Sequence, residues 1–166
     1  MNVWCPNAFL KPSTVTKSSS VGKIKGSYFY QPHALLARQK MFGARSRVTG
    51  LYLAGDGELN DVRVIMNEKW TNQKQGTKSD NKYNGTLYWK SDQLKSFGVR
   101  YDTKSVEIKQ VRVTAKDKSW AEIRLDGKAK NISNTISVPS GKSVVGIYGT
   151  LYDGDVTSLG LYYAKV

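Results

Sequence analysis

The sequence predicts an all-β protein built from three repeated units, and three observations favour this fold class. First, a strand–turn–strand pattern occurs three times at an even spacing along the chain. Second, apolar and polar residues alternate in the expected strands, which is typical of a strand with one buried face. Third, the 166 residues include 10 tyrosines and 15 glycines, and these residue types favour strands and tight turns respectively.

The repeat is marked by three glycines, Gly50, Gly98 and Gly146, which stand 48 residues apart. Each glycine lies in a first expected strand, where it suggests a bulge or a close approach of another backbone. A short polar turn and a second strand follow. The second strands share a pair of apolar residues at alternate positions: Val62 and Val64, Val111 and Val113, and Leu159 and Leu161. Each unit is therefore expected to be a long hairpin.

Further turn sequences between the units predict additional hairpins. They contain glycine, proline, asparagine or aspartate: Asn84-Gly85, Lys116-Asp117-Lys118, Asp126-Gly127 and Pro139-Ser140-Gly141-Lys142. Strands are expected over residues 26–31 and 120–125. Residues 67–81 are polar and are predicted to form a long exposed loop or an irregular hairpin. Only residues 33–40 have helical character, over two turns at most.

A repeat of about 48 residues, made of about four strands, closes on itself when it occurs three times. The sequence thus predicts a β-prism, in which three sheets surround a pseudo-threefold axis. A β-trefoil is the alternative, because its repeats have a similar length, whereas a propeller of three blades would not close. The prism is expected to span residues 24–166 as one domain. Residues 1–23 are basic and are predicted to form a flexible arm.

The residue inventory argues against an enzyme and against a metal or other cofactor. His33 and Cys5 are the only histidine and cysteine, so few nucleophile–base pairs, no cysteine metal cluster and no intramolecular disulfide can form. Nothing marks a catalytic pair among the 13 acidic residues. No apolar run approaches the roughly 20 residues of a membrane span. Residues 1–6 lack the features of a secretory signal, so an intracellular location or a non-classical export is favoured.

The net charge of +13 predicts attraction to polyanions. No acidic residue precedes Asp56, and the stretch before it contains eight basic residues: Lys11, Lys17, Lys23, Lys25, Arg38, Lys40, Arg45 and Arg47. Tyr28, Phe29 and Tyr30 lie close to two of these lysines, and such a mixture of charge and aromatic rings suits stacked bases. One hypothesis is therefore a polyanion- or RNA-binding structural protein, such as a small viral coat protein with a basic N-terminal arm.

The last unit carries a more specific pattern. An apolar strand ends in Gly146-Ile147-Tyr148-Gly149, and after a loop the chain continues as Gly154-Asp155-Val156-Thr157-Ser158-Leu159-Gly160. Residues 138–163 therefore resemble the closing hairpin of the jacalin-related lectins, whose pattern is Gly-Phe/Tyr-x-Gly, a loop, and Gly-x-x-x-Asp before a small residue, an aliphatic residue and Gly. The resemblance implies a β-prism that binds mannose or galactose. The glycine-rich first loop of that family is not visible in the N-terminal third.

The resemblance also implies where a sugar would bind. In the family, the carboxylate of Gly-x-x-x-Asp accepts hydrogen bonds from two sugar hydroxyls, and backbone N–H groups of the loop bind sugar oxygens. Carried over by position, Gly154 is the glycine, Asp155 and Val156 are the backbone donors, and Ser158 stands where the family has its aspartate.

Two replacements for the missing carboxylate are open. In one, Asp153 or Asp155 supplies the carboxylate and Tyr148 or Tyr152 stacks on the sugar. In the other, the loop of the first unit binds the sugar, because Gly57 and Asp61 keep the Gly-x-x-x-Asp pattern. Alternatively, both loops are plain turns with solvated acidic side chains.

The favoured hypothesis is a non-catalytic, lectin-like module. Its expected partners are mannose-type or galactose-type glycans, or acidic glycans if the basic charge contributes, with nucleic acid as the alternative. A lectin is also expected to gain multivalency by forming a homo-oligomer.

Overall fold

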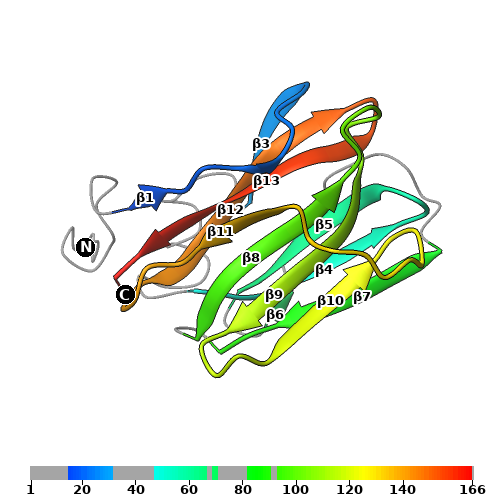
Figure 1. Cartoon of the computed structure of the whole chain (residues 1–166). Coiled ribbons are helices and arrows are strands. Elements are labelled where there is room, and N and C mark those ends of the chain that lie inside the picture. Colours follow the sequence, from blue (N-terminus) through cyan, green and yellow to red (C-terminus); the bar gives the residue numbers. More distant parts are fainter. Residues whose placement is uncertain (1–14, 32–46, 67–68, 71–81, 91–92, 166) are drawn as a thin grey trace.

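The computed structural model describes residues 15–31, 47–66, 69–70, 82–90 and 93–165. Its elements are β-strands arranged in three sheets around a shared core (Figure 1). This confirms the predicted all-β class and the three-sheet β-prism, which displaces the trefoil alternative. The predicted helical turns at residues 33–40 lie outside the described residues. Among the residues that are described, no helix is long and apolar enough to cross a membrane.

The first two sheets have four strands each and the same topology, with a central hairpin flanked by two outer strands. The first sheet, in the order β6-β5-β4-β7, contains β4 (Val48–Gly55), β5 (Leu59–Met66), β6 (Lys69–Trp70) and β7 (Tyr83–Tyr88). The second, in the order β10-β9-β8-β11, contains β8 (Leu94–Tyr101), β9 (Ile108–Ala115), β10 (Trp120–Arg124) and β11 (Asn134–Ser137). Apart from β6, the loop predicted at residues 67–81 lies outside the described residues.

The third sheet joins segments from both ends of the sequence. Its central hairpin is β12 (Ser143–Tyr152) and β13 (Asp155–Ala164), and its other strands are β1 (Thr16–Lys17), β2 (Val21–Gly22) and β3 (Ser27–Gln31). β3 pairs with β12, while β1 and β2 pair with β13, so the blue strands of Figure 1 lie along the orange and red hairpin.

The sheet therefore starts earlier in the chain than the sequence predicted. Within the expected arm at residues 1–23, Ser18 N donates to Leu161 O and Lys23 N donates to Thr157 O, both at 2.9 Å. These backbone hydrogen bonds fix the later part of that segment on β13. Residues 1–14 lie outside the described residues.

The three central hairpins have β-bulges at matching positions. One extra residue lies in each first strand, at Thr49, Lys95 and Val145, and one in each second strand, at Asn60, Lys109 and Thr157. In this register the predicted apolar pairs of the second strands do correspond, and all six side chains are buried in the core.

The glycine alignment and one turn differ from the sequence prediction. Gly50 and Gly146 directly follow their bulges, but the matching residue in the second hairpin is Ser96, two positions before Gly98. Asn84-Gly85 is not a turn, because it lies inside β7, where Gly85 pairs with Leu53 of β4. Pairing with the neighbouring strand thus overrides a strong local turn signal.

Candidate functional site

The β12–β13 turn consists of two residues that both have left-handed backbone conformations. Tyr152 pairs with Asp155, and between them Asp153 has φ 51° and Gly154 has φ 82°. Positive φ at both central residues defines the type I′ hairpin turn, which glycine and aspartate tolerate well. The turn leaves Asp153 exposed, and the side chain of Tyr152 is 47 % exposed. The end of the third sheet therefore presents a carboxylate beside an aromatic ring.

A second segment closes over this hairpin. The glycine-bounded loop, residues 22–26, connects β2 to β3, and its two glycines have φ 86° and 91°. A Cβ atom on Gly26 would lie 1.8 Å from the backbone oxygen of Leu151, and one on Gly22 would lie 2.5 Å from that of Thr157. Only glycine permits such contacts. This loop was not predicted from the sequence, although the pattern Gly22-x-x-x-Gly26 is a signal for it.

A buried cluster of three hydroxyls holds the glycine-bounded loop against the hairpin. Thr150 Oγ1 lies 2.6 Å from Ser158 Oγ and 2.7 Å from Thr157 Oγ1. Thr157 Oγ1 donates to the backbone oxygen of Lys25 at 3.0 Å, and Lys25 N donates to Thr150 Oγ1 at 3.4 Å. Ser158, which stands at the family's aspartate position, is fully buried. Its hydroxyl therefore stabilises the loop and is not accessible to a sugar.

Tyr148 is also covered, although the sequence suggested it as a stacking ring. It is 3 % exposed, and its hydroxyl donates to the backbone oxygen of Ser18. The Nζ atom of Lys17 lies 4.4 Å from its ring centroid, and the Tyr162 ring lies 5.3 Å away. Burial raises the pKa of Tyr148. Of the two predicted rings, only Tyr152 is exposed enough to stack on a ligand.

The remaining residues of the predicted C-terminal loop contribute through the backbone or the edge of the turn. Val156 is fully buried and points its side chain into the core, while Asp155 is half-buried at the start of β13. The structure thus brings Asp153, Gly154 and Tyr152 together with the glycine-bounded loop. We refer to residues 22–26, Tyr28 and residues 152–155 as the hairpin site.

Two of the predicted polyanion-binding residues, Lys23 and Lys25, belong to the hairpin site, and a third, Lys17, lies beside it. Lys25 Nζ lies 4.1 Å from the ring centroid of Tyr152, and Lys17 Nζ lies 5.5 Å from that of Tyr28, which is 51 % exposed. Lys23 is exposed on the glycine-bounded loop. Arg47 is half-buried at the start of the first sheet. Lys11, Arg38, Lys40 and Arg45 lie outside the described residues.

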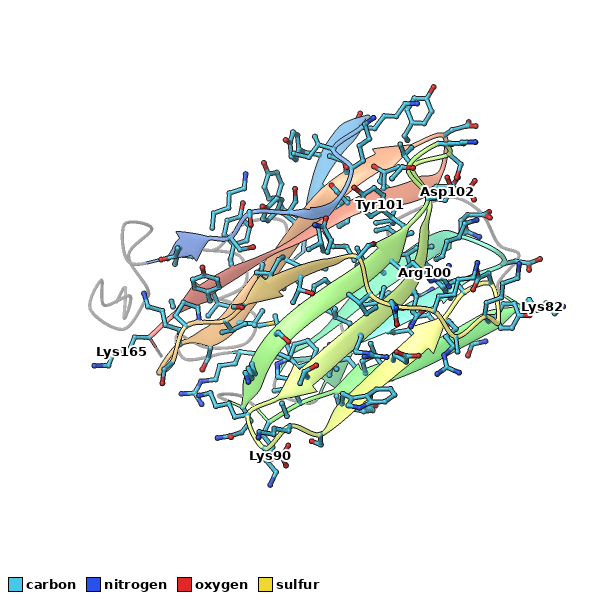
Figure 2. The ribbon with its side chains drawn as sticks, viewed as in Figure 1. Lys82, Lys90, Arg100, Tyr101, Asp102 and Lys165 are labelled. Atoms are coloured by element: carbon cyan, nitrogen blue, oxygen red, sulfur yellow. The ribbon has the colours of Figure 1, made fainter. Side chains whose placement is uncertain are left out.

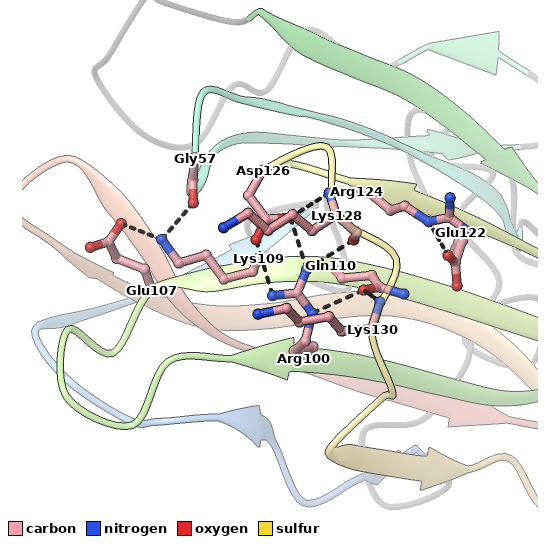
Figure 3. Close-up of polar contacts among 10 residues, drawn as sticks. All are labelled: Gly57, Arg100, Glu107, Lys109, Gln110, Glu122, Arg124, Asp126, Lys128 and Lys130. Atoms are coloured by element: carbon pink, nitrogen blue, oxygen red, sulfur yellow. Dashed lines mark hydrogen bonds and ion pairs between the residues drawn. The ribbon is translucent and has the colours of Figure 1, made fainter.

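The loop of the first unit does not present its aspartate to solvent. Asp61 follows the bulge of β5 and is fully buried, and its carboxylate forms an ion pair with Arg63 at 3.0 Å between Oδ2 and Nη2. Gly57 has φ 85°, and its backbone oxygen accepts a hydrogen bond from Lys109 Nζ at 2.7 Å (Figure 3). The predicted sugar acceptor is therefore already occupied by an arginine of its own strand.

The same position is a buried polar residue in all three hairpins. Gln110 of the second hairpin matches Asp61 and Ser158, and its Oε1 accepts from Arg100 Nε at 2.9 Å (Figure 3). Arg100 also forms an ion pair with Asp126 at 2.8 Å. At this position Gln110 and Ser158 bond to the first strand of their hairpins, whereas Asp61 pairs with an arginine of its own strand. Among the described residues, no three His, Cys, Asp or Glu side chains gather as a metal site would require.

No protein-family model and no curated protein sequence matches the chain. Solved structures do match it. A prostate-specific WGA16 glycoprotein lectin is 19 % identical, with a TM-score of 0.61 over 88 % of this chain and 98 % of that one. A mannose-binding lectin from Champedak is 13 % identical, with a TM-score of 0.64 over 93 % and 99 % of the two chains.

A third solved structure, a mannose-binding jacalin-related lectin from Ananas comosus, is 15 % identical, with a TM-score of 0.59 over 92 % and 99 % of the two chains. At such identities the likeness shows the fold. The chain therefore has the β-prism fold of the jacalin-related lectins, and the resemblance seen in its last unit is confirmed at that level.

Proposed function

We propose that the chain is a non-catalytic, carbohydrate-binding module whose glycan site is the hairpin site. The observation that carries the proposal is the closure of the glycine-bounded loop over the β12–β13 turn, which gathers an exposed ring, a carboxylate and an ammonium group at one end of the third sheet. Two mannose-binding lectins among the matched structures support the ligand class. A single histidine and a single cysteine support the absence of catalysis.

The chemistry of the hairpin site suits a hydroxyl-rich ring. The face of a sugar with several C–H bonds packs on an aromatic side chain, and Tyr152 offers such a surface. The charged carboxylate of Asp153 can accept hydrogen bonds from two hydroxyls at once, and such bonds are stronger than neutral ones. Since glycine conformations and buried hydroxyls fix the backbone around both residues, little ordering remains to oppose binding.

The proposal is tested by screening neutral glycans, acidic glycans and single-stranded RNA at about 0.15 M salt and again at about 1 M, where charge attraction is largely screened. We expect saturable binding of a neutral glycan that persists at high salt. Asp153→Asn keeps the left-handed turn but removes the charge, so it should weaken binding about tenfold or more.

Asp56→Asn is the matched control, because Asp56 lies in the turn of the equivalent β4–β5 hairpin. It should leave the affinity unchanged. Equal affinity of the wild type and both variants would contradict the assignment of the site, and an absence of neutral-glycan binding would contradict the function.

A second candidate function is polyanion binding, and the gathering of Lys17, Lys23 and Lys25 on the third sheet favours it. This function predicts that affinity falls steeply with salt. Replacing Lys23 and Lys25 together by glutamine should then reduce the slope of log affinity against log salt by about 1.5–2. The control, Lys95→Gln with Lys104→Gln, removes two exposed lysines, one in β8 and one in the β8–β9 loop. Binding that persists at high salt would contradict this second candidate.

A further inference from the structure

A cavity lies at the end of the prism that is remote from the hairpin site. It consists of two adjoining parts. Asp117 lines the larger part, of about 400 Å³, and Trp120 lines the smaller part, of about 120 Å³. Four residues line both parts: Tyr88, Trp89, Ala115 and Ser119. The strand register fixes its place: Tyr88 pairs with Gly50, at the start of β4, five residues from the β4–β5 turn. In Figure 2, Lys90 of the cavity lies at the opposite end of the molecule from Asp102 in the β8–β9 loop.

Two exposed aromatic side chains form part of the wall. Tyr88, at the end of β7, is 61 % exposed, and Trp120, at the start of β10, is 54 % exposed. The guanidinium group of Arg112 lies 4.1 Å from the Trp120 ring centroid. Arg112 is itself fixed by an ion pair with Glu122 at 2.6 Å. The Trp120 ring is therefore supported by a charged, anchored neighbour, as a preorganised binding surface requires.

Polar groups complete the wall between these rings. The carboxylate of Asp117 accepts a hydrogen bond from Ser119 N at 2.9 Å, and a further bond from the Ser119 hydroxyl lowers its pKa, so it is charged near neutral pH. Trp89 is 8 % exposed, and its buried indole N–H has no hydrogen-bond partner in the described part of the chain. Because this N–H is closed off from solvent, Trp89 contributes to the wall through its ring and not through a hydrogen bond to a ligand.

We propose that this cavity is a second glycan-binding site, in which a neutral sugar ring packs on Tyr88 or Trp120 and its hydroxyls bond to the carboxylate of Asp117. The volume of the larger part lies within the range of roughly 300–1,000 Å³ that is usual for small-ligand sites. The combination of exposed rings with a charged carboxylate matches a sugar, which has an apolar C–H face and a polar edge. A purely apolar partner would desolvate the charged carboxylate of Asp117 without offering it a new hydrogen bond.

This site stands on its own residues and does not depend on the hairpin site. If both bind glycans, a single chain is bivalent and can cross-link a branched glycan without forming an oligomer. This consequence rests on the proposed function, whereas binding in the cavity does not. The two sites must therefore be observed separately.

Two-dimensional NMR of the ¹⁵N-labelled chain distinguishes binding at the two sites. The indole N–H signals of Trp89 and Trp120 report on the cavity, and the amide signals of residues 22–26 report on the hairpin site. The probes are methyl α-mannoside, methyl β-galactoside and an N-acetylglucosamine trimer, at about 0.5 M salt to screen charge attraction. We expect saturable shifts of both indole signals with at least one probe. Trp120→Ala and Asp117→Asn should each weaken this binding about tenfold.

Two controls keep the experiment decisive. Tyr30→Ala removes another exposed tyrosine, on the third sheet, and should leave the cavity shifts unchanged, as should Asp153→Asn. The side chain of Trp120 is more than half exposed, so its loss should not unfold the chain, and an unchanged amide spectrum elsewhere verifies this. A Trp89 indole signal that responds to none of the probes, or that reports the same affinity in the wild type and in both cavity variants, would overturn the proposal.

Discussion

Gly26→Ala tests whether the glycine-bounded loop is held against the hairpin as the structure shows. A Cβ atom at this position would lie 1.8 Å from the backbone oxygen of Leu151, and the residue has φ 91°. A left-handed conformation costs a residue with a Cβ atom about 1–2 kcal/mol. Relieving the overlap requires the backbone to move, which typically costs a further 1–3 kcal/mol or so. The free energy of unfolding should therefore fall by about 2–5 kcal/mol.

Gly141→Ala is the matched control. Gly141 has φ 79°, and a Cβ atom there would meet nothing within 4 Å, so only the conformational cost of about 1–2 kcal/mol applies. Chemical denaturation of the three proteins, with equal m-values, gives both differences. The Gly26 variant should also lose glycan affinity, because the loop that carries Lys25 must shift. Equal stability losses in the two variants would refute the close contact between the loop and β12.

Further predictions concern stability and titration. Asp61→Ala should lower the free energy of unfolding by about 1–3 kcal/mol, because Arg63 loses its partner but is 35 % exposed and so partly solvated. The glycan affinity of this variant should match that of the wild type, and a loss of binding would show that Asp61 contacts the glycan. Burial alone would raise the pKa of Glu122, but hydrogen bonds from two arginines outweigh burial and hold the pKa below the ordinary 4.5. The stability that ionised Glu122 contributes should therefore be complete above about pH 4.5 and fade as the pH falls through the lowered pKa. Glu122→Gln should flatten the acid limb of the curve of unfolding free energy against pH, and an unchanged limb would contradict the ion pairs. Burial raises the pKa of Tyr162 to about 12, so its ionisation should destabilise the fold only above pH 10. In an absorbance titration, Tyr162→Phe should therefore lack the one tyrosine that ionises near pH 12.

Much of the fold could be predicted because its long strands are periodic. The alternation at Val62 and Val64 recurs in all three second strands, and each pair is buried. The glycine spacing predicted the alignment of the three hairpins less well than the alternation did. Gly98 was aligned with Gly50 and Gly146, although the bulge at Lys95 puts Ser96 in that place. A bulge changes the register without leaving a fixed residue type, so spacing alone cannot locate it.

The short N-terminal strands could not be predicted for a different reason. β1 and β2 have two residues each, which is too short for any alternation to be visible. They form because β13, far away in the sequence, offers unpaired backbone groups to two short segments, residues 16–18 and 21–23. The same pairing covers Tyr148 and Ser158, so the exposure of two predicted site residues depended on contacts that local patterns do not encode.

The candidate site was predicted in part. The turn sequence placed Asp153 and Gly154 at the end of a hairpin, and the structure agrees. The glycine-bounded loop could not be predicted, because its glycines are required only by close contacts with Leu151 and Thr157, which are distant in the sequence. Asp61 is unavailable to a ligand because its carboxylate pairs with Arg63, two residues further along the same strand face. Chemistry could thus be read from residue types, but accessibility required the packed sheets.

The most direct test of the central claim is an NMR titration of the ¹⁵N-labelled chain with neutral glycans at high salt, in which the amides of the glycine-bounded loop and of residues 152–155 are followed together. The account predicts saturable shifts in both segments at one shared dissociation constant, and their loss in Asp153→Asn. Saturable glycan binding that leaves both segments unshifted, or no binding by any glycan, would contradict it.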